Sequence, residues 1–147
     1  MIKFYALTKT DGGVEIMQCF DGADPTIEIE RWSPSARARL TGEVTEVDPA
    51  AIPNDRTFRD AWTPALDVDM GKARTIYLNR VRAARDAELE RLDIEALKAI
   101  ERSDQVQTAR IVAEKQKLRD LPQTFDLASA TTPDELKASW PEGLETM

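Results

Sequence analysis

The residue types that most often carry out catalysis or bind metals are scarce in this chain of 147 residues. There is no histidine, which removes the commonest general base and the commonest metal ligand. The lone cysteine, Cys19, lies in a predicted strand without a histidine to activate it, so we interpret it as a small core residue. Gly12-Gly13 lacks the glycine spacing and the following Lys-Ser/Thr of a phosphate-binding loop. Asp67 and Asp69 lack the rest of a calcium loop and fit helix capping better. We therefore expect no enzymatic activity, no cofactor and no metal.

The charge of the chain is negative and unevenly distributed. The formal net charge is −7, divided into −6 over residues 1–71, +3 over 72–121 and −4 over 122–147. Nucleic-acid binding needs a concentrated basic surface, so we expect no nucleic-acid partner. An acidic body with a mildly basic segment is compatible with charge-complementary contacts to a protein partner or to a second copy of the chain.

The chain shows no sequence feature of a membrane or secreted protein. No apolar stretch approaches roughly 18 residues, so we expect no membrane span. Residues 1–5 lack the apolar core and cleavage site of a signal peptide. One cysteine excludes an internal disulfide framework and fits a reducing compartment.

The first 64 residues predict a small α+β domain with a connector. Two strand-like segments flank Asp11-Gly12, a strong hairpin signal. A short helix is predicted from the cap Asp24-Pro25 up to Pro34, and a second from residue 35 to 40, ending at Gly42. Alternation over 43–48 predicts a third strand returning to the hairpin. Prolines punctuate the connector over 49–64.

A long helical region dominates the rest of the sequence. Residues 72–121 contain no glycine and no proline, and Pro122 closes the run. The apolar pattern lapses around Ser103-Asp104, which can cap a new helix, so we predict a helical hairpin over 65–122 rather than one rod. The apolar residues of the second helix are Val106, Ala109, Val112, Ala113, Leu118 and Leu121. After a linker, Thr132-Pro133 starts a short helix in a C-terminal tail, 123–147, ending at Trp140-Pro141. The fold class expected is α+β.

The long helix carries an apolar stripe that is the leading candidate for an interaction surface. Its members are Leu78, Val81, Leu89, Leu92, Ala96 and Ile100, with Arg85 interrupting. A short second helix does not cover the whole stripe, so part of it should face another protein or a second copy of the chain. Tryptophans outside the long helices are packing anchors, although one could be an interface anchor instead. The interface candidates are Leu78, Val81, Arg82, Leu89, Leu92, Ile100, Trp62 and Trp140.

Two interpretations of the charges on the long helix stay open. Basic residues crowd its first turns and acidic residues follow, opposite to the preference of the helix dipole. In the first interpretation they form a solvated face with local pairs such as Arg82–Asp86 and Arg91–Glu95. In the second they form a charged strip that docks onto a partner and sets the pairing register.

Three motifs in order make the chain resemble small tailed-phage proteins. They are Arg82-x-x-Arg85-Asp86-x-x-Leu89-x-x-x-Asp93, a helix end reading Lys117-Leu118-Arg119-Asp120-Leu121-Pro122, and a downstream Trp140-Pro141. The segments 55–62 and 68–74 are also similar to phage tail-region proteins. Proteins of this kind are tail assembly chaperones or tail-fibre assembly proteins. The resemblance covers roughly residues 50 to 142.

The resemblance implies a non-enzymatic role in the phage tail region. The leading expectation is a tail or tail-fibre assembly chaperone that binds a structural tail protein through its helical arm in the host cytoplasm. The alternative is a minor virion component, such as a tail-tip, baseplate or fibre-attachment protein, that stays in the particle. A third class is a small regulatory or host-inhibitor protein carried by a phage.

Overall fold

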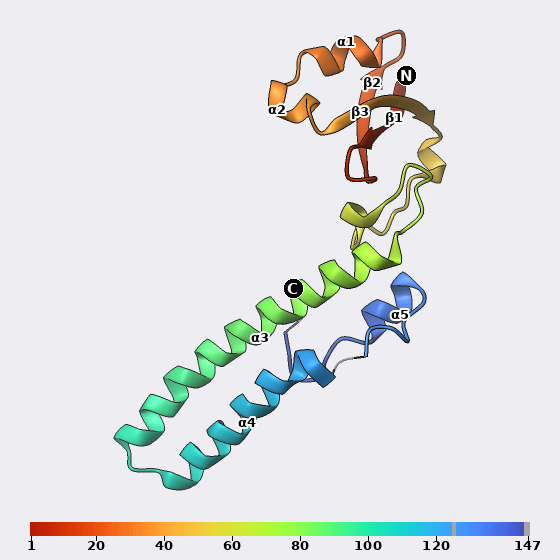
Figure 1. The fold of residues 1–147 in the computed structure, drawn as a ribbon. Coiled ribbons are helices and arrows are strands. Elements are labelled where there is room, and N and C mark those ends of the chain that lie inside the picture. The colour runs from red at the N-terminus through yellow and green to blue at the C-terminus, as the bar shows by residue number, and fades with distance from the viewer. Residues whose placement is uncertain (125, 146–147) are drawn as a thin grey trace. The chain divides into compact units, whose positions relative to one another are not determined.

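A computed structural model describes residues 1–124 and 126–145 of the chain, and it shows an α+β protein. A three-stranded antiparallel sheet at the N-terminus is followed by a long helix pair and a short C-terminal helix (Figure 1). The chain divides into two compact units, Met1–Ala73 and Arg74–Met147. The predicted segments 65–122 and 123–147 both contribute to the second unit.

The predicted hairpin forms the larger part of the sheet. Strands β1 (Ile2–Lys9) and β2 (Val14–Phe20) pair antiparallel, and β3 (Leu40–Val47) pairs with the other edge of β1, giving the order β2-β1-β3. Gly12 takes a φ of 75° in the turn, where a side chain would be strained. Asp11 Oδ1 accepts a 2.8 Å hydrogen bond from the Gly13 N–H, and this bond lowers the pKa of the Asp11 carboxyl.

Both faces of the sheet are buried. On one face Tyr5, Leu7, Met17 and Cys19 form a cluster that Ala23, Ile29 and Trp32, from the helical excursion between β2 and β3, cover. On the other face Ala6, Val14 and Trp62 pack together, with Ile16, Val47, Ile52, Leu66 and Val68 around them. Alternating side chains of a strand point to opposite faces, so β2 contributes to both clusters.

The first two helices begin at prolines. Helix α1 (Pro25–Glu30) starts as predicted, with Asp24 Oδ1 accepting from the Thr26 N–H at 2.9 Å. Pro34 does not merely stop that helix, because it is the first residue of α2 (Pro34–Arg37), whose cap is Ser33. The expectation of a helix reaching residue 40 was wrong, since Leu40 already belongs to β3. Proline suits the first helical position because its fixed φ already matches the helix. The N–H that it lacks would have had no partner within the helix at that position.

The connector between the sheet and the long helices is ordered by short turns. It contains two 3₁₀ turns, η1 (Pro49–Ala51) and η2 (Arg59–Ala61), and a β-bridge between Trp62 and Val68. Trp62 is thereby placed under the sheet, where it is 5% exposed. The connector acts as the second cover of the sheet.

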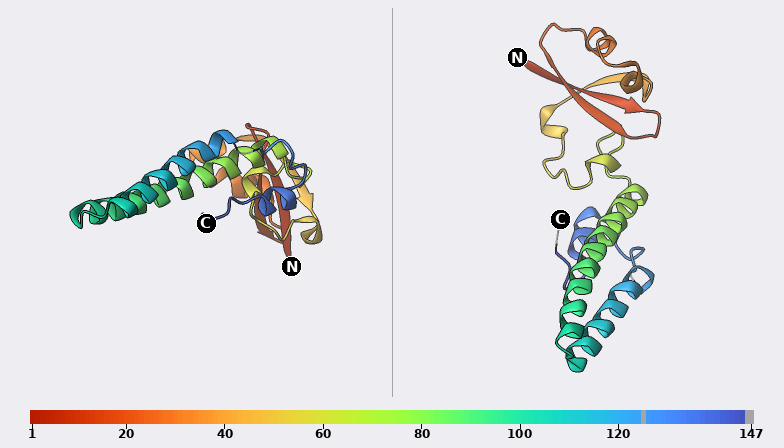
Figure 2. Two further views of the ribbon diagram at one scale, coloured as in Figure 1. Left: turned by 90° about the horizontal axis from the view of Figure 1, so that it is seen from below. Right: turned by 90° about the vertical axis from the view of Figure 1, so that its left-hand side faces the viewer.

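The second unit is built on a helical hairpin, as the sequence predicted. Helix α3 (Met70–Glu101) and helix α4 (Gln105–Thr124) lie side by side (Figure 2), joined by Leu92, Ala99 and Ile111 in one buried cluster. Asp69 caps α3 through a 3.1 Å bond from the Lys72 N–H to its carboxylate.

The reversal between α3 and α4 has the hydrogen bonds of a Schellman motif. The Ser103 N–H donates to the Ile100 carbonyl and the Asp104 N–H to the Ala99 carbonyl, each at 2.9 Å, while Ser103 takes a φ of 56°. Asp104 then caps α4 by accepting from the Gln107 N–H at 3.0 Å. The same two residues thus end one helix and start the next.

Pro122 does not end α4 as the sequence predicted. The helix continues to Thr124. A proline removes the bond to the residue four positions earlier, but a terminal turn already leaves several carbonyls without helical donors. Pro122 is therefore tolerated within the last turn.

A C-terminal segment folds back on the beginning of α3. Helix α5 (Pro133–Ala138) has a full capping box between Thr132 and Glu135. Hydrogen bonds to the carboxylate, first from the Thr131 N–H at 2.7 Å, lower the pKa of Glu135. Leu136 is fully buried. Arg74 ties the preceding loop to α3 by donating to the carbonyls of Leu127 and Ala130, at 3.0 and 2.8 Å.

The reversal predicts opposite effects for two neighbouring substitutions. Asp104→Ala removes the α4 cap and should lower the free energy of unfolding by about 1 kcal/mol. Ser103→Gly should raise it by roughly 0.5–1 kcal/mol, because relief of left-handed strain outweighs the extra freedom of the unfolded chain. Urea unfolding followed by circular dichroism measures both, and a destabilising Ser103→Gly would contradict the strain argument.

Candidate protein-interaction surface

The one cysteine of the chain is buried against the sheet. Cys19 is 6% exposed under α1, and burial raises the pKa of its thiol, which disfavours the reactive thiolate. In residues 1–124 and 126–145, no group of three or more Cys, Asp and Glu side chains is placed to hold a metal ion. Within the same ranges no helix is long and apolar enough to cross a membrane.

The buried stripe of α3 is offset from the predicted one. Its buried members are Ala73, Tyr77, Val81, Ala84, Leu92 and Ala99. Val81 is 0% and Leu92 is 1% exposed, so the expectation that these two face another chain was wrong. Leu92 packs on Ala99 and Ile111 inside the hairpin. The prediction placed the stripe by its large aliphatic side chains alone. The buried stripe also contains alanines and a tyrosine, and these shift its centre around the helix.

The other predicted candidates on α3 lie beside this stripe. Leu78 and Leu89 are half-buried and Arg82 is exposed. Ile100 is 60% exposed, although the predicted stripe included it. At about 100° of rotation per residue these four positions fall within one narrow sector flanking the buried centre. They form a margin that is partly available to a partner.

The two candidate tryptophans serve as packing anchors. Trp62 belongs to the buried cluster with Ala6 and Val14. Trp140 meets the ring of Tyr77 edge-on, with centroids 5.6 Å apart, and donates from Nε1 to the Leu144 carbonyl at 3.1 Å. Ser139 Oγ donates to the Tyr77 hydroxyl at 3.2 Å. The C-terminal segment therefore closes over α3 at Tyr77.

A second apolar surface of the hairpin was not identified from the sequence. Ile94 is 56% and Leu97 is 62% exposed. At about 100° per residue, Ile94 lies roughly 160° around α3 from Leu92, and Leu97 roughly 160° from Ala99. These side chains thus point away from α4. On a helical wheel of residues 92–100 the apolar side chains fall into two separate sectors, and Ile94 and Leu97 belong to the second of them. Ile100 of the margin lies roughly 60° from Leu97, and we call Ile94, Leu97 and Ile100 together the outer face of α3.

The second helix of the hairpin also exposes aliphatic side chains. Val106 is 83% and Val112 is 58% exposed, whereas Ile111 is 1% exposed. The sequence had placed Val106 and Val112 on the packed stripe and had not singled out Ile111. Around α4, Val112 lies roughly 100° and Val106 roughly 140° from Ile111, so both point away from the buried cluster that Ile111 joins.

Charged side chains brace the flanks of the hairpin. Arg91 binds Glu88, with Nε–Oε2 at 2.8 Å, and also pairs with Glu95 as predicted. The hydrogen bonds from Arg91 lower the pKa of the Glu88 carboxyl. Lys115 of α4 pairs with Asp93 of α3.

Asp86 does not form the expected pair with Arg82. The partner of Asp86 is Arg85, at 2.7 Å, while Arg82 is exposed. Most of these pairs are exposed and join residues that are close in sequence. This favours the interpretation of the charges as a solvated face with local pairs.

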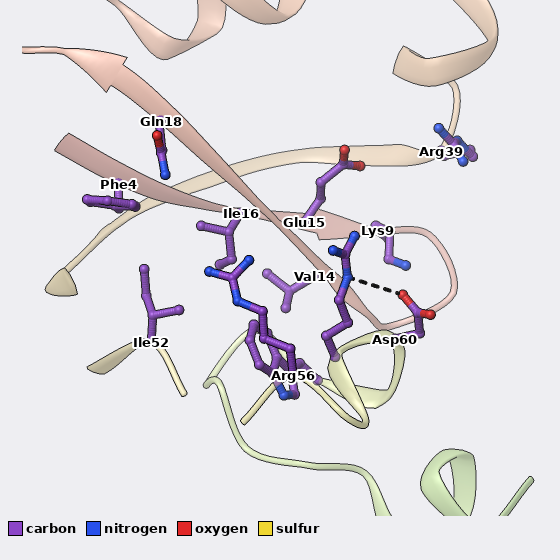
Figure 3. Close-up of a pocket in the computed structure, with 12 residues that line it drawn as sticks. Phe4, Lys9, Val14, Glu15, Ile16, Gln18, Arg39, Ile52, Arg56 and Asp60 are labelled. Carbon is purple, nitrogen blue, oxygen red and sulfur yellow. Dashed lines mark ion pairs between the residues drawn. The ribbon is translucent and has the colours of Figure 1, made fainter. Parts of the chain in front are cut away.

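The N-terminal unit holds a cationic pocket at the sheet. Its volume is about 320 Å³, and Figure 3 shows the side chains around it. An apolar floor of Phe4, Val14, Ile16, Ile52 and Trp62 is surrounded by Lys9, Arg39, Arg56 and Arg59, with Glu15, Gln18 and Asp60 completing the lining. Arg59 Nε lies 3.8 Å from Asp60 Oδ1. No sequence motif marked this pocket, because its residues come from five separate segments.

Comparisons of the chain with protein-family models, with curated proteins and with solved structures found no match. Functional inference therefore depends on the residues and their placement.

The two leucines at positions 92 and 97 should respond differently to truncation. Leu92→Ala opens a cavity in the hairpin and should lower the free energy of unfolding by about 2–5 kcal/mol. Leu97→Ala changes an exposed position and should alter it by less than about 0.5 kcal/mol. Chemical denaturation of the two variants measures this contrast. Equal losses would show that the outer face of α3 is buried in the folded protein.

Proposed function

We propose that this protein is a non-enzymatic bacteriophage tail-region protein, an assembly chaperone for a tail or tail-fibre structural protein. In this proposal the helical hairpin is the binding arm, and the chain acts in the host cytoplasm while tails assemble. The observation that carries the proposal is the outer face of α3, where Ile94, Leu97 and Ile100 are 56%, 62% and 60% exposed.

The outer face of α3 has the chemistry of a binding surface. Fully burying one large aliphatic side chain contributes about 1.5–3 kcal/mol, and grouped exposed apolar side chains mark interaction sites. Intramolecular packing is already supplied on the opposite side of the helix by Leu92, Ala99 and Ile111. The outer face is thus free to take a partner without opening the hairpin.

The phage-like motifs support the same assignment through where they lie. The first motif runs along α3, the second lies in the C-terminal part of α4, and Trp140 of the third packs on Tyr77 of α3. All three motifs therefore belong to the unit that presents the outer face. Their placement is what a family built around a shared binding arm would require.

Charge adds selectivity to this surface. Residues 72–121 carry a net +3 in an otherwise acidic chain, so an acidic region of a tail protein would be attracted to the arm. Exposed Arg82, which lies in the same sector of α3 as Ile100, would contact that acidic region and help to fix the register of binding.

The arm can be tested by co-purification from cells that are producing tails. The double variant Ile94→Ser/Leu97→Ser should lose the associated tail protein while keeping wild-type helicity by circular dichroism. The matched control is Ile2→Ser/Ile27→Ser, since these isoleucines are 50% and 51% exposed in the N-terminal unit. The proposal fails if the arm variant still co-purifies with tail protein, or if both variants lose it equally.

The chaperone and virion-component roles differ in the composition of finished particles. A chaperone leaves its client on assembly, so mass spectrometry of purified particles should find this protein absent or well below the copy number of tail proteins. A fixed copy number in the particle would instead establish the alternative, a tail-tip, baseplate or fibre-attachment component.

A further inference from the structure

The two outer strands of the sheet differ in how well their free edges are protected. Strand β3 is irregular: its register shifts between Leu7 and Lys9 of β1, Gly42 has a φ of 92°, and Glu43 and Glu46 are exposed. Bulges, glycines and charges are the devices that keep an edge strand from pairing with another chain. The β3 edge is therefore closed to strand addition.

Strand β2 has none of those devices. Its seven residues pair with β1 in one unbroken register, and they include one charge, Glu15, with no glycine and no proline. The strand ends at Phe20, which is 78% exposed. Unprotected edges of this kind are where another chain can add a strand.

The hydrogen-bonding groups on the free side of β2 can be identified from the ladder. The Lys9 N–H donates to the Gly13 carbonyl and the Asp21 N–H to the Met1 carbonyl, both at 2.9 Å. Bonded and non-bonded pairs alternate along an antiparallel ladder, so the odd-numbered residues of β2 bond to β1. Val14, Ile16 and Gln18 consequently turn their N–H and C=O groups to the free edge.

The cationic pocket lies on one face of the sheet and includes this edge strand. Val14, Ile16 and Gln18 share the face of β2 that packs on Trp62, and all three line the pocket. Arg56 extends from the connector to the neighbourhood of Ile16 (Figure 3). The lining carries four cations, Lys9, Arg39, Arg56 and Arg59, against the two acids Glu15 and Asp60, in a segment whose overall charge over residues 1–71 is −6.

From this juxtaposition we infer that the β2 edge binds an extended segment of another protein by strand addition, and that the segment carries carboxylates on the side facing the cationic pocket. Main-chain bonds to Val14, Ile16 and Gln18 supply the pairing, and the cations select acidic side chains. Residues directly opposite across a ladder share a face, so the acids stand at alternate positions of the bound segment. The inference goes beyond the proposed function and concerns a surface that the arm does not contain.

A second copy of the chain fits this edge less well than an acidic segment does. Antiparallel pairing of two β2 strands would bring one acid per copy, Glu15, to four cations. It would also bring together two segments of net charge −6, and like charge opposes association. An acidic strand from a partner satisfies the pocket without that cost.

Defined peptides test the inference on the full-length protein. The probe is acetyl-Thr-Val-Glu-Val-Glu-Val-Glu-Val-Thr-amide, and its matched control has glutamine in place of each glutamate. Two further probes carry N-methyl groups on the odd or on the even residues, so each removes the donors of one peptide edge only. Binding is followed by the backbone amide signals of the protein in two-dimensional NMR.

The glutamate peptide should shift the amide signals of residues 14–20, and the glutamine peptide should bind more weakly. One N-methyl peptide should bind like the parent and the other should not bind, because only one peptide edge pairs with β2. Arg56→Gln/Arg59→Gln should weaken binding of the glutamate peptide by about threefold or more, since each exposed ion pair contributes modestly. The matched charge control, Arg31→Gln/Arg37→Gln on α1 and α2, should bind like the wild type.

Several outcomes would overturn the inference. One is that the glutamate peptide at millimolar concentration shifts no amide signal of residues 14–20. Others are that the glutamine peptide binds as tightly as the glutamate peptide, or that both N-methyl peptides bind equally. The last is that the Arg56/Arg59 and Arg31/Arg37 double variants weaken binding equally. If the protein alone sediments as a dimer that the peptide does not disrupt, and the residue 14–20 signals shift with protein concentration, the edge joins two copies instead. Because these readouts lie in residues 14–20, they are independent of the arm variant and of the particle composition.

Discussion

The difference in length between the two helices of the hairpin is the constraint on which the second unit depends. Helix α3 has 32 residues and α4 has 20, so α4 leaves the beginning of α3 without a helical partner. The C-terminal segment covers this part, with Trp140 on Tyr77 and Leu136 fully buried. A single returning helix also covers only one side of α3, which leaves Ile94 and Leu97 on the other side. Coverage of α3 near Tyr77 by the C-terminal segment follows from the shorter α4, and the exposure of Ile94 and Leu97 follows from α4 lying along one side of α3.

Local signals in the sequence were sufficient for the first hairpin turn and for most helix starts. Asp-Gly at residues 11–12, the cap at Asp24-Pro25, the pair Ser103-Asp104 and the capping box at Thr132 each satisfy backbone groups within a few residues. Such signals act without help from distant parts of the chain. For that reason the hairpin, the helix break and the α5 start were predictable.

Features that depend on tertiary packing, such as which side of α3 is buried, were predicted less accurately from the sequence. The stripe of α3 was centred on large aliphatic residues, whereas the structure buries Ala84, Ala99 and Tyr77 along with Val81 and Leu92. Two apolar sectors share the helix, and only the returning α4 decides which of them is covered. Pro34 and Pro122 were both predicted to end a helix. Pro34 is instead the first residue of α2, and Pro122 lies within the last turn of α4. The cationic pocket was invisible in sequence because its residues meet only when the connector folds under the sheet.

The protein carries two surfaces of different chemistry, each in its own compact unit. The outer face of α3 is aliphatic, and the β2 edge offers main-chain bonds beside four cations. Separate surfaces allow one chain to contact two regions of a partner, or two partners, with each contact changing independently of the other.

The position of Cys19 gives the N-terminal unit a chemical reporter of its own. It is the one cysteine of the chain, it lies in the cluster between the sheet and α1, and its pKa is raised by burial. A thiol reagent reaches it only when that cluster opens. The rate of thiol modification at a fixed pH therefore reports how often the first unit opens, while signals from the long helices report the second unit separately.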